Sequence, residues 1–136
     1  MTEAHTSWLT AFITRCGGVA GTVHLREEGA LRLVASHNIP PQVVAITREI
    51  PKGKGMAGLA WERGRPVQTC NLKDDDTGDV RPGAKAVDAM AAVALPIFES
   101  DEVVAVVGVA FGDERELDDA TLEGMARDAA SVPRAG

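Results

Sequence analysis

The chain has 136 residues, the size of one domain with a substantial core. Hydrophobic residues make up 45% of it and aromatic residues 4%, so we expect a core of small and β-branched side chains. Residues 1–70 carry eight lysines and arginines against five aspartates and glutamates, whereas residues 71–136 carry six against fifteen. This acidic balance, with no basic stripe, argues against nucleic acid as a partner.

The N-terminus lacks the basic and apolar regions of a signal peptide, and no apolar run reaches the roughly 18 residues of a membrane span. The two cysteines, Cys16 and Cys70, make neither a disulfide framework nor a zinc motif. We therefore expect a cytoplasmic, soluble protein that forms a single domain over residues 1–136 and does not contact a membrane.

The first predicted element is a helix over residues 6–16, because its apolar residues recur on one face and two glycines follow it. A strand over residues 19–26 alternates, with Thr22 and His24 on its polar side. An antiparallel strand over residues 31–36 completes a hairpin. No acid or nucleophile lies near His24 in the sequence, so we assign it no catalytic role.

A short helix is predicted from Pro40-Pro41 to about residue 46, with Asn38 as its candidate N-cap. A short strand over residues 47–50 follows, and then a second short helix over residues 56–63. Gly64 is expected to end that helix in the left-handed conformation.

Gly53, Gly55 and Gly58 have the spacing of a dinucleotide-binding fingerprint. That interpretation requires a buried parallel strand before the glycines and a long crossover helix after them, and the sequence offers neither. The backbone N–H groups of residues 53–57, next to Lys54, suit an anion-binding nest at a helix N-terminus. An ordinary solvated turn would carry the same lysine, so both interpretations stay open.

The remaining predicted elements are a strand at 67–70, an irregular loop at 71–85, one or two helical turns at 84–89, strands at 90–98 and 103–111, and a final helix from Asp118 to about Ser131. The two long strands are continuously apolar, which indicates an interior hairpin buried on both faces. Asp118 is the expected N-cap of the final helix, and Leu117 and Leu122 are expected to form a hydrophobic staple.

Hairpins dominate this order, so the predicted fold class is α+β, with a central antiparallel sheet of five to six strands. The terminal helices are expected to cover one face of the sheet. The short helices and the long loop are expected to cover the other face.

Four segments carry a family resemblance: IPKGKGMAGLAWERGRPV at residues 50–67, AAVALPI at 91–97, VVAVVGVAF at 103–111 and ELDDATLEGMARDAAS at 116–131. Their content and order resemble the GAF domain family, and the resemblance extends from about Trp8 to Ser131. It implies a GAF-like fold and a module that binds a cyclic nucleotide, a tetrapyrrole, a small metabolite or an anion. It also implies dimerisation through the terminal helices, since family members often associate that way.

The sequence departs from the known ligand-binding branches of the family that it resembles. It lacks the Asn-Lys-x-x-x-Phe pattern of the cyclic-nucleotide binders, and it has no Cys-His pair where bilin-attaching members need one. Members that reduce free methionine sulfoxide use several cysteines near the pocket, whereas this chain has only Cys70 in that region. A reductase that uses Cys70 is therefore one alternative function, although this cysteine also suits a buried structural position. A ligand-free dimerisation module is the other alternative.

The candidate ligand site lies in the long loop, because loops of this length in compact domains are usually functional. Arg81 and Lys85 would neutralise an anionic ligand, and polar side chains beside them would form hydrogen bonds to it. The expected ligand-binding residues are Cys70, Asn71, Asp76, Thr77, Asp79, Arg81, Lys85 and Lys54. A surface loop with internal ion pairs would have the same composition, so that alternative stays open. The aspartates lack the spacing of an EF-hand, and we predict no metal site.

We expect a sensory or regulatory module, without catalytic activity or a cofactor, that binds a small anionic metabolite between the sheet and residues 71–89. We expect a chain of this length to hold no effector domain. We therefore expect it to form a homodimer and to act through a signalling partner protein such as a histidine kinase or a transcription regulator.

Overall fold

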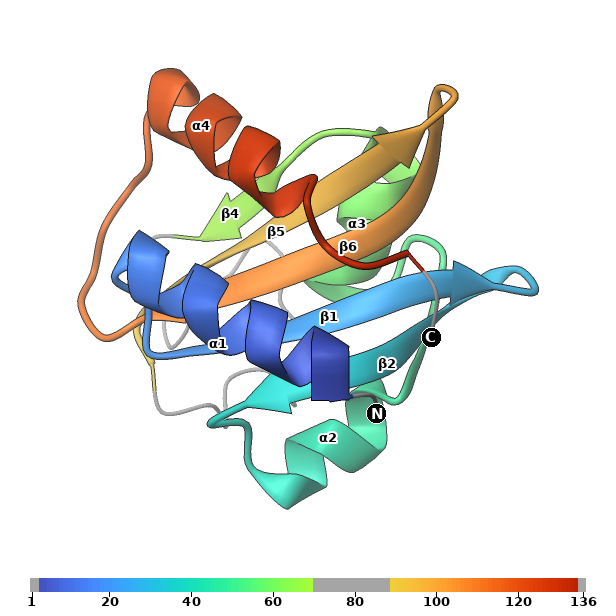
Figure 1. The fold of residues 1–136 in the computed structure, drawn as a ribbon, viewed down its shortest axis with the longest axis horizontal. Helices are drawn as coiled ribbons and strands as arrows, with labels where there is room; N and C mark the ends of the chain where they lie inside the picture. Colours follow the sequence, from blue (N-terminus) through green and yellow to red (C-terminus); the bar gives the residue numbers. More distant parts are fainter. Residues whose placement is uncertain (1–2, 70–88, 135–136) are drawn as a thin grey trace.

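A computed structural model describes residues 3–69 and 89–134 of the chain. The helices are α1 (Glu3–Cys16), α2 (Pro41–Thr47), α3 (Gly55–Arg63) and α4 (Asp119–Ala129). The strands are β1 (Ala20–Glu27), β2 (Ala30–His37), β3 (Glu49–Pro51), β4 (Val67–Thr69), β5 (Ala91–Glu99) and β6 (Glu102–Phe111). Together they form an α+β fold, which confirms the predicted class (Figure 1).

The six strands form one sheet in the order β3-β2-β1-β6-β5-β4, and every neighbouring pair is antiparallel. β1 and β6 lie at its centre. The terminal helices α1 and α4 cover one face, whereas α2 and α3 lie on the other side (Figure 1). The predicted separation of the terminal helices from the short helices is therefore confirmed.

The larger core cluster lies between the sheet and the two terminal helices. Leu9, Phe12 and Ile13 of α1 are buried in it, so the apolar face predicted for this helix is used within the domain. The central strands supply the large side chains that meet them, which are Val23, Leu25, Leu95, Val107, Val109 and Phe111. Burial of this apolar area supplies most of the free energy that holds α1 on the sheet.

The start of α2 differs from the prediction. The N-cap position is Pro40, with no side-chain hydrogen bond, so the assignment of Asn38 as the N-cap is wrong. Asn38 adopts a left-handed φ of 55°, and its Nδ2 donates to the carbonyl oxygen of Val19 at 2.9 Å. This side chain instead holds the loop after β2 against the residue that precedes β1. The next strand is also displaced from the prediction, since α2 extends to Thr47 and β3 spans Glu49–Pro51.

The other local predictions agree with the structure where it can be compared. Asp118 caps α4, because its Oδ1 accepts from the backbone N–H of Thr121 at 2.8 Å, and this hydrogen bond lowers the pKa of the Asp118 carboxyl. Leu117 and Leu122 pack, partly buried, against the core, and their contact with each other as a staple stays a prediction. The interior hairpin is also confirmed, since β5 and β6 each have a neighbour on both sides. Residues 84–88, where helical turns were predicted, lie outside the described residues.

A close approach between β1 and its neighbours requires glycine at position 21. A Cβ on Gly21 would lie 2.5 Å from the carbonyl oxygen of Gly108 and 2.9 Å from Cδ1 of Ile13. Gly21→Ala should therefore lower the free energy of unfolding by about 1–3 kcal/mol in urea denaturation, because backbone as well as side chain must move.

Gly124 in α4 is the matched control, since a Cβ there would meet nothing within 4 Å. Gly124→Ala should raise the free energy of unfolding by up to about 1 kcal/mol, because alanine has the higher helix propensity. Equal effects of the two substitutions would contradict the role of close packing at Gly21.

Candidate functional site

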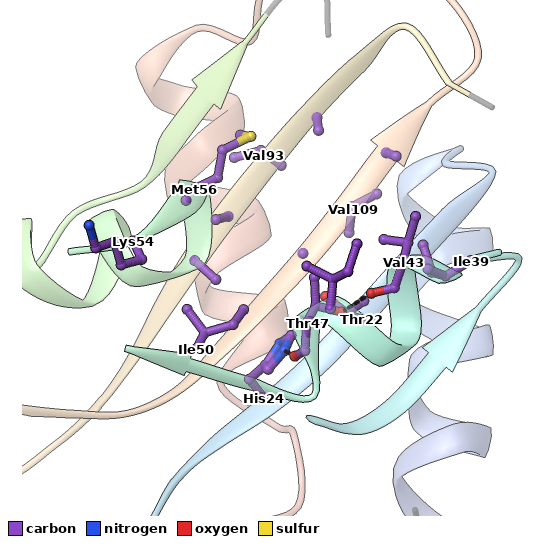
Figure 2. Close-up of a pocket in the computed structure, with 18 residues that line it drawn as sticks. Thr22, His24, Ile39, Val43, Thr47, Ile50, Lys54, Met56, Val93 and Val109 are labelled. Atoms are coloured by element: carbon purple, nitrogen blue, oxygen red, sulfur yellow. Dashed lines mark hydrogen bonds between the residues drawn. The ribbon is translucent and has the colours of Figure 1, made fainter. Parts of the chain in front are cut away.

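A cavity of about 140 Å³ lies between the sheet and the short helices, on the face opposite α1 and α4 (Figure 2). Its floor is the middle of the sheet, and its walls are α2, β3 and the start of α3. The floor residues that face the cavity are Thr22 and His24 of β1, Ala92 and Ala94 of β5, and Gly108 and Ala110 of β6. The cavity therefore lies over the three adjacent strands β1, β6 and β5.

The floor is low along β5 and β6, because these two strands present small residues to the cavity. Along β5, Ala92 and Ala94 alternate with Val93 and Leu95, which belong to the core under α1 and α4. β6 repeats the alternation, with a glycine and an alanine on the cavity side. Close-packed interiors leave few voids, so a row of residues no larger than alanine is what keeps this space open.

The walls of the cavity are mainly apolar. Ile39, Val43 and Ile46 come from the α2 side, Ile50 from β3, and Met56 and Ala57 from α3. Such walls would contact the hydrocarbon part of a ligand. The charged side chain of the described lining that is not a histidine is Lys54 at the start of α3, and the buried side-chain atom there without a hydrogen-bond partner is Nδ1 of His24.

The glycines at the start of α3 are explained by backbone conformation and by close packing. Gly53 and Gly55 have φ values of 83° and 66°, in the left-handed region that favours glycine. A Cβ on Gly58 would lie 2.6 Å from the carbonyl oxygen of Pro51, so α3 packs directly on the end of β3. β3 is an antiparallel edge strand, which excludes the dinucleotide-binding interpretation of this glycine spacing.

The start of α3 borders the cavity with backbone N–H groups that the helix itself does not use. The N–H groups of Gly53 and Lys54 are used within the turn, where they donate to Gly58 at 2.9 Å and to Pro51 at 3.2 Å. Those of residues 55–57 have no acceptor within the helix, and no described turn or cap hydrogen bond uses them. Two of the five N–H groups of the predicted anion nest are therefore already used, and those of residues 55–57, in the first turn of α3, are the ones left for an anion.

Lys54 adds a positive charge to this helix end. It occupies the N-cap position, provides no side-chain cap, and lines the cavity (Figure 2). Among the described residues no carboxylate forms an ion pair with it. The partial charge of the helix terminus and the lysine together make this end of the cavity attractive to an anion.

His24 supplies the second polar place on the lining. Its side chain is only 2% exposed, and its Nε2 lies 2.8 Å from the carbonyl oxygen of Thr47 at the end of α2. Burial lowers the pKa of His24 from 6.5 to about 4, against the opposing effect of the Thr47 carbonyl. The ring is therefore neutral at pH 7, and Nδ1 has no hydrogen-bond partner among the described residues.

The depressed pKa of His24 makes stability depend on pH. The unfolded chain takes up the proton near pH 6.5 and the folded protein only near pH 4, so the stabilising contribution is complete above pH 6.5 and is lost as pH falls toward 4. Compared with His24→Gln, the native protein should lose about 2 kcal/mol more of its free energy of unfolding between pH 7 and pH 4.5. Urea denaturation at both pH values measures this difference. If the native protein and His24→Gln lose the same free energy of unfolding, groups other than His24 cause the pH dependence.

Most of the predicted ligand-binding residues lie outside the described part of the chain. These are Cys70, Asn71, Asp76, Thr77, Asp79, Arg81 and Lys85, and they stay predictions. Lys54 is the predicted residue that the structure places on the cavity. Sequence reasoning missed His24 and Thr22. The sequence did place both residues on the polar side of the predicted strand. They line a cavity only because β1 is a central strand of the sheet, and the sequence alone does not give the strand order.

The described residues outside the cavity offer little other chemistry. Cys16 lies at the end of α1 on the opposite side of the sheet, and burial raises the pKa of its thiol. The described residues contain no group of three or more His, Cys, Asp and Glu that could hold a metal ion. None of the described helices is long and apolar enough to cross a membrane.

The comparison with family models gives a single assignment. A GAF domain model matches residues 7–132. The chain belongs to the GAF domain family. This confirms the resemblance carried by the four sequence segments. No curated protein sequence matches this GAF domain.

Solved structures share the fold of this GAF domain at low sequence identity. The nlh2 GAF domain of A. aeolicus, in an inactive state, is 21% identical, with 96% of this chain and 79% of that chain covered and a TM-score of 0.67. A type II free methionine-R-sulfoxide reductase from Thermoplasma acidophilum is 12% identical, with coverages of 94% and 90% and a TM-score of 0.70. The NreA protein of Staphylococcus aureus, mutated in its nitrate binding site, is 16% identical, with coverages of 84% and 89% and a TM-score of 0.67. These similarities extend to the fold alone.

Proposed function

We propose that this GAF domain is a small-molecule sensor that binds a compact anionic metabolite in the cavity between the sheet and the short helices. The observation that carries the proposal is the uncapped start of α3, which borders an otherwise mainly apolar cavity beside Lys54. By the volume that one water needs, the cavity has room for roughly ten water-sized atoms. NreA, a protein of the same fold with a nitrate binding site, supports an anionic ligand.

We propose a binding role rather than a catalytic one. The described lining contains neither a carboxylate nor a cysteine, and the buried His24 has no acid or nucleophile beside it there. General acid–base catalysis needs such a partner within hydrogen-bonding reach of the reacting group. This composition of the described lining supports a binding role.

Identification of the natural ligand is the direct test of this proposal. Native mass spectrometry of protein purified from its own host should reveal a co-purifying small molecule, and thermal unfolding with a panel of metabolites should show a raised midpoint for an anion. A clean mass without ligand, combined with no thermal shift across the panel, would refute the sensor function.

Lys54→Ala should weaken binding of the anion about threefold to tenfold and reduce the dependence of affinity on salt, because Lys54 is exposed and its charge is partly screened. Lys52→Ala removes an equal charge from the same turn and is the matched control. The Nζ of Lys52 lies 5.4 Å from the centre of the Trp61 ring and is directed there rather than to the cavity. Isothermal titration calorimetry measures the affinity of both variants for the anion. An equal loss of affinity in Lys54→Ala and Lys52→Ala would contradict a specific role of Lys54.

The free methionine-R-sulfoxide reductases of the same fold favour a second candidate, a thiol-dependent reductase that uses Cys70. Under our proposal the native protein shows no turnover of free methionine-R-sulfoxide with dithiothreitol as reductant. Turnover that Cys70→Ser abolishes and Cys16→Ser retains would replace the sensor function by the reductase. Cys16 suits the control because it lies across the sheet from the cavity.

We further propose that the sensor is cytoplasmic, forms a homodimer and acts on a signalling partner such as a histidine kinase or a transcription regulator. GAF domains often occur in multidomain signalling proteins, which supports such a partner. A dimer through α1 and α4 would use their outer surfaces, since Leu9, Phe12 and Ile13 are already buried within the domain. Size-exclusion chromatography with light scattering distinguishes a dimer from a monomer.

A further inference from the structure

We propose that Thr22 is a second anchor of the cavity, and that the ligand is a flat anion of one ring with an oxygen substituent at the end remote from its anionic group. The inference rests on the proposed function, because it specifies the ligand of the same cavity. It is carried by the accessible hydroxyl of Thr22 on the floor and by the glycine that separates this hydroxyl from α3.

The side chain of Thr22 stands on the cavity side of β1. Its two neighbours in the strand belong to the other face. A Cβ on Gly21 would lie 2.9 Å from Cδ1 of Ile13 in α1, and Val23 is part of the core under α1 and α4. Successive side chains of a strand alternate between the two faces, so Thr22 is directed to the opposite face, where it lines the cavity (Figure 2).

The surface that Thr22 exposes opens to the cavity. Within residues 20–25 of β1 it is only partly buried, whereas the other five residues are buried. β2 and β6 pair with the two edges of β1, and α1 and α4 cover the opposite face of the sheet. A Cβ on Gly108, on the neighbouring strand, would lie 3.0 Å from Oγ1 of Thr22, so the hydroxyl lies next to the floor of the cavity.

The hydroxyl of Thr22 is free to bind a ligand. The lining has a second threonine, Thr47, whose hydroxyl donates to the carbonyl oxygen of Val43 at 2.8 Å. None of the described residues forms a hydrogen bond with Oγ1 of Thr22. The buried side-chain nitrogen or oxygen without a partner in the described structure is Nδ1 of His24, so the unpartnered Oγ1 of Thr22 is not buried. Because a hydroxyl both donates and accepts, it suits a hydroxyl, carbonyl or carboxylate oxygen of a ligand.

Gly108 separates this hydroxyl from the start of α3. Thr22 pairs with Gly108 of β6, and Gly108 pairs with Ala94 of β5, so the three residues form one row across the sheet. Adjacent strands are about 4.8 Å apart, which places the backbone of β5 roughly 10 Å from that of β1. Met56, in the first turn of α3, packs against the cluster that contains Ala94. Figure 2 accordingly shows Lys54 and Met56 on one side of the cavity and Thr22 on the other.

The floor between the two places is flat and suits a planar ring. Gly108 adds no side chain to it, and Ala94 and Ala110 add one methyl group each. Val43 and Met56 provide apolar atoms around this floor, as the body of a ligand requires. One ring with a carboxylate and one oxygen substituent has about ten non-hydrogen atoms, which matches the room in the cavity. The carboxylate then lies at the start of α3, and the oxygen substituent reaches Thr22 across Gly108.

The test compares benzoate with its 2-, 3- and 4-hydroxy derivatives and with the 3- and 4-methyl derivatives, which have similar size but no hydrogen-bonding substituent. Isothermal titration calorimetry on the full chain uses the native protein, Thr22→Val and Thr22→Ser. Valine keeps the branched shape without the hydroxyl, whereas serine keeps the hydroxyl. In the native protein the 3- or the 4-hydroxy derivative should bind about threefold to tenfold more tightly than the methyl derivative of the same position. Thr22→Val should abolish this preference, and Thr22→Ser should retain it.

The test has a matched control ligand and a control for folding. The hydroxyl of 2-hydroxybenzoate lies beside its carboxylate, at the end remote from Thr22, so its affinity relative to benzoate should be the same in the native protein and in Thr22→Val. In urea denaturation without ligand, the midpoint of Thr22→Val should be no lower than that of the native protein, because the hydroxyl has no partner among the described residues to lose. A clearly lower midpoint means that the hydroxyl bonds within the protein and overturns the inference.

The outcomes separate the inference from the proposed function. A hydroxyl preference below about twofold at both positions, or one that survives in Thr22→Val, overturns the role of Thr22. Benzoate binding that weakens in Lys54→Ala would in that case still support the anion sensor. If no benzoate binds to the native protein, the inference is overturned, and the metabolite panel decides the proposed function by itself.

Discussion

The cavity depends on one constraint, the alternation of small and large side chains along β5 and β6. At the cavity, Val93, Leu95, Val107 and Val109 belong to the core under α1 and α4, whereas Ala92, Ala94, Gly108 and Ala110 lie on the cavity side. Larger residues at those positions would fill the space, because protein interiors pack to nearly constant density. The same strands therefore stabilise the domain on one face and leave room for a ligand on the other.

Two polar parts of the cavity lining are positioned by the main chain. The start of α3 is held by the glycine turn that packs on the end of β3, and the ring of His24 is held by the carbonyl oxygen of Thr47. Groups oriented in this way lose little conformational freedom when a ligand binds, which favours affinity. α2 takes part in both roles, since it forms one wall and also supplies the acceptor that orients the ring.

The sequence predicted the ends of helices well where they depend on residues close in the sequence, such as an N-cap side chain or a glycine after the last turn. Asp118 caps α4, and Gly64 has the left-handed φ expected at the end of α3. Asn38 shows the limit of this reasoning. Its position before two prolines suggested an N-cap, but its amide donates to Val19, a residue that the hairpin brings close only in the folded chain.

The helical face of α1, the interior hairpin and the GAF resemblance could all be read from residue order, since each depends on periodicity or on a local turn. The location of the cavity could not. Small residues in β5 and β6 become a floor only when β1 pairs with β6 and the short helices settle on the opposite side from α1. His24 likewise gains its low pKa and its unpaired nitrogen from burial beneath α2. Burial and hydrogen-bond partners are set by strand order and helix placement, and these arise from contacts between distant parts of the chain.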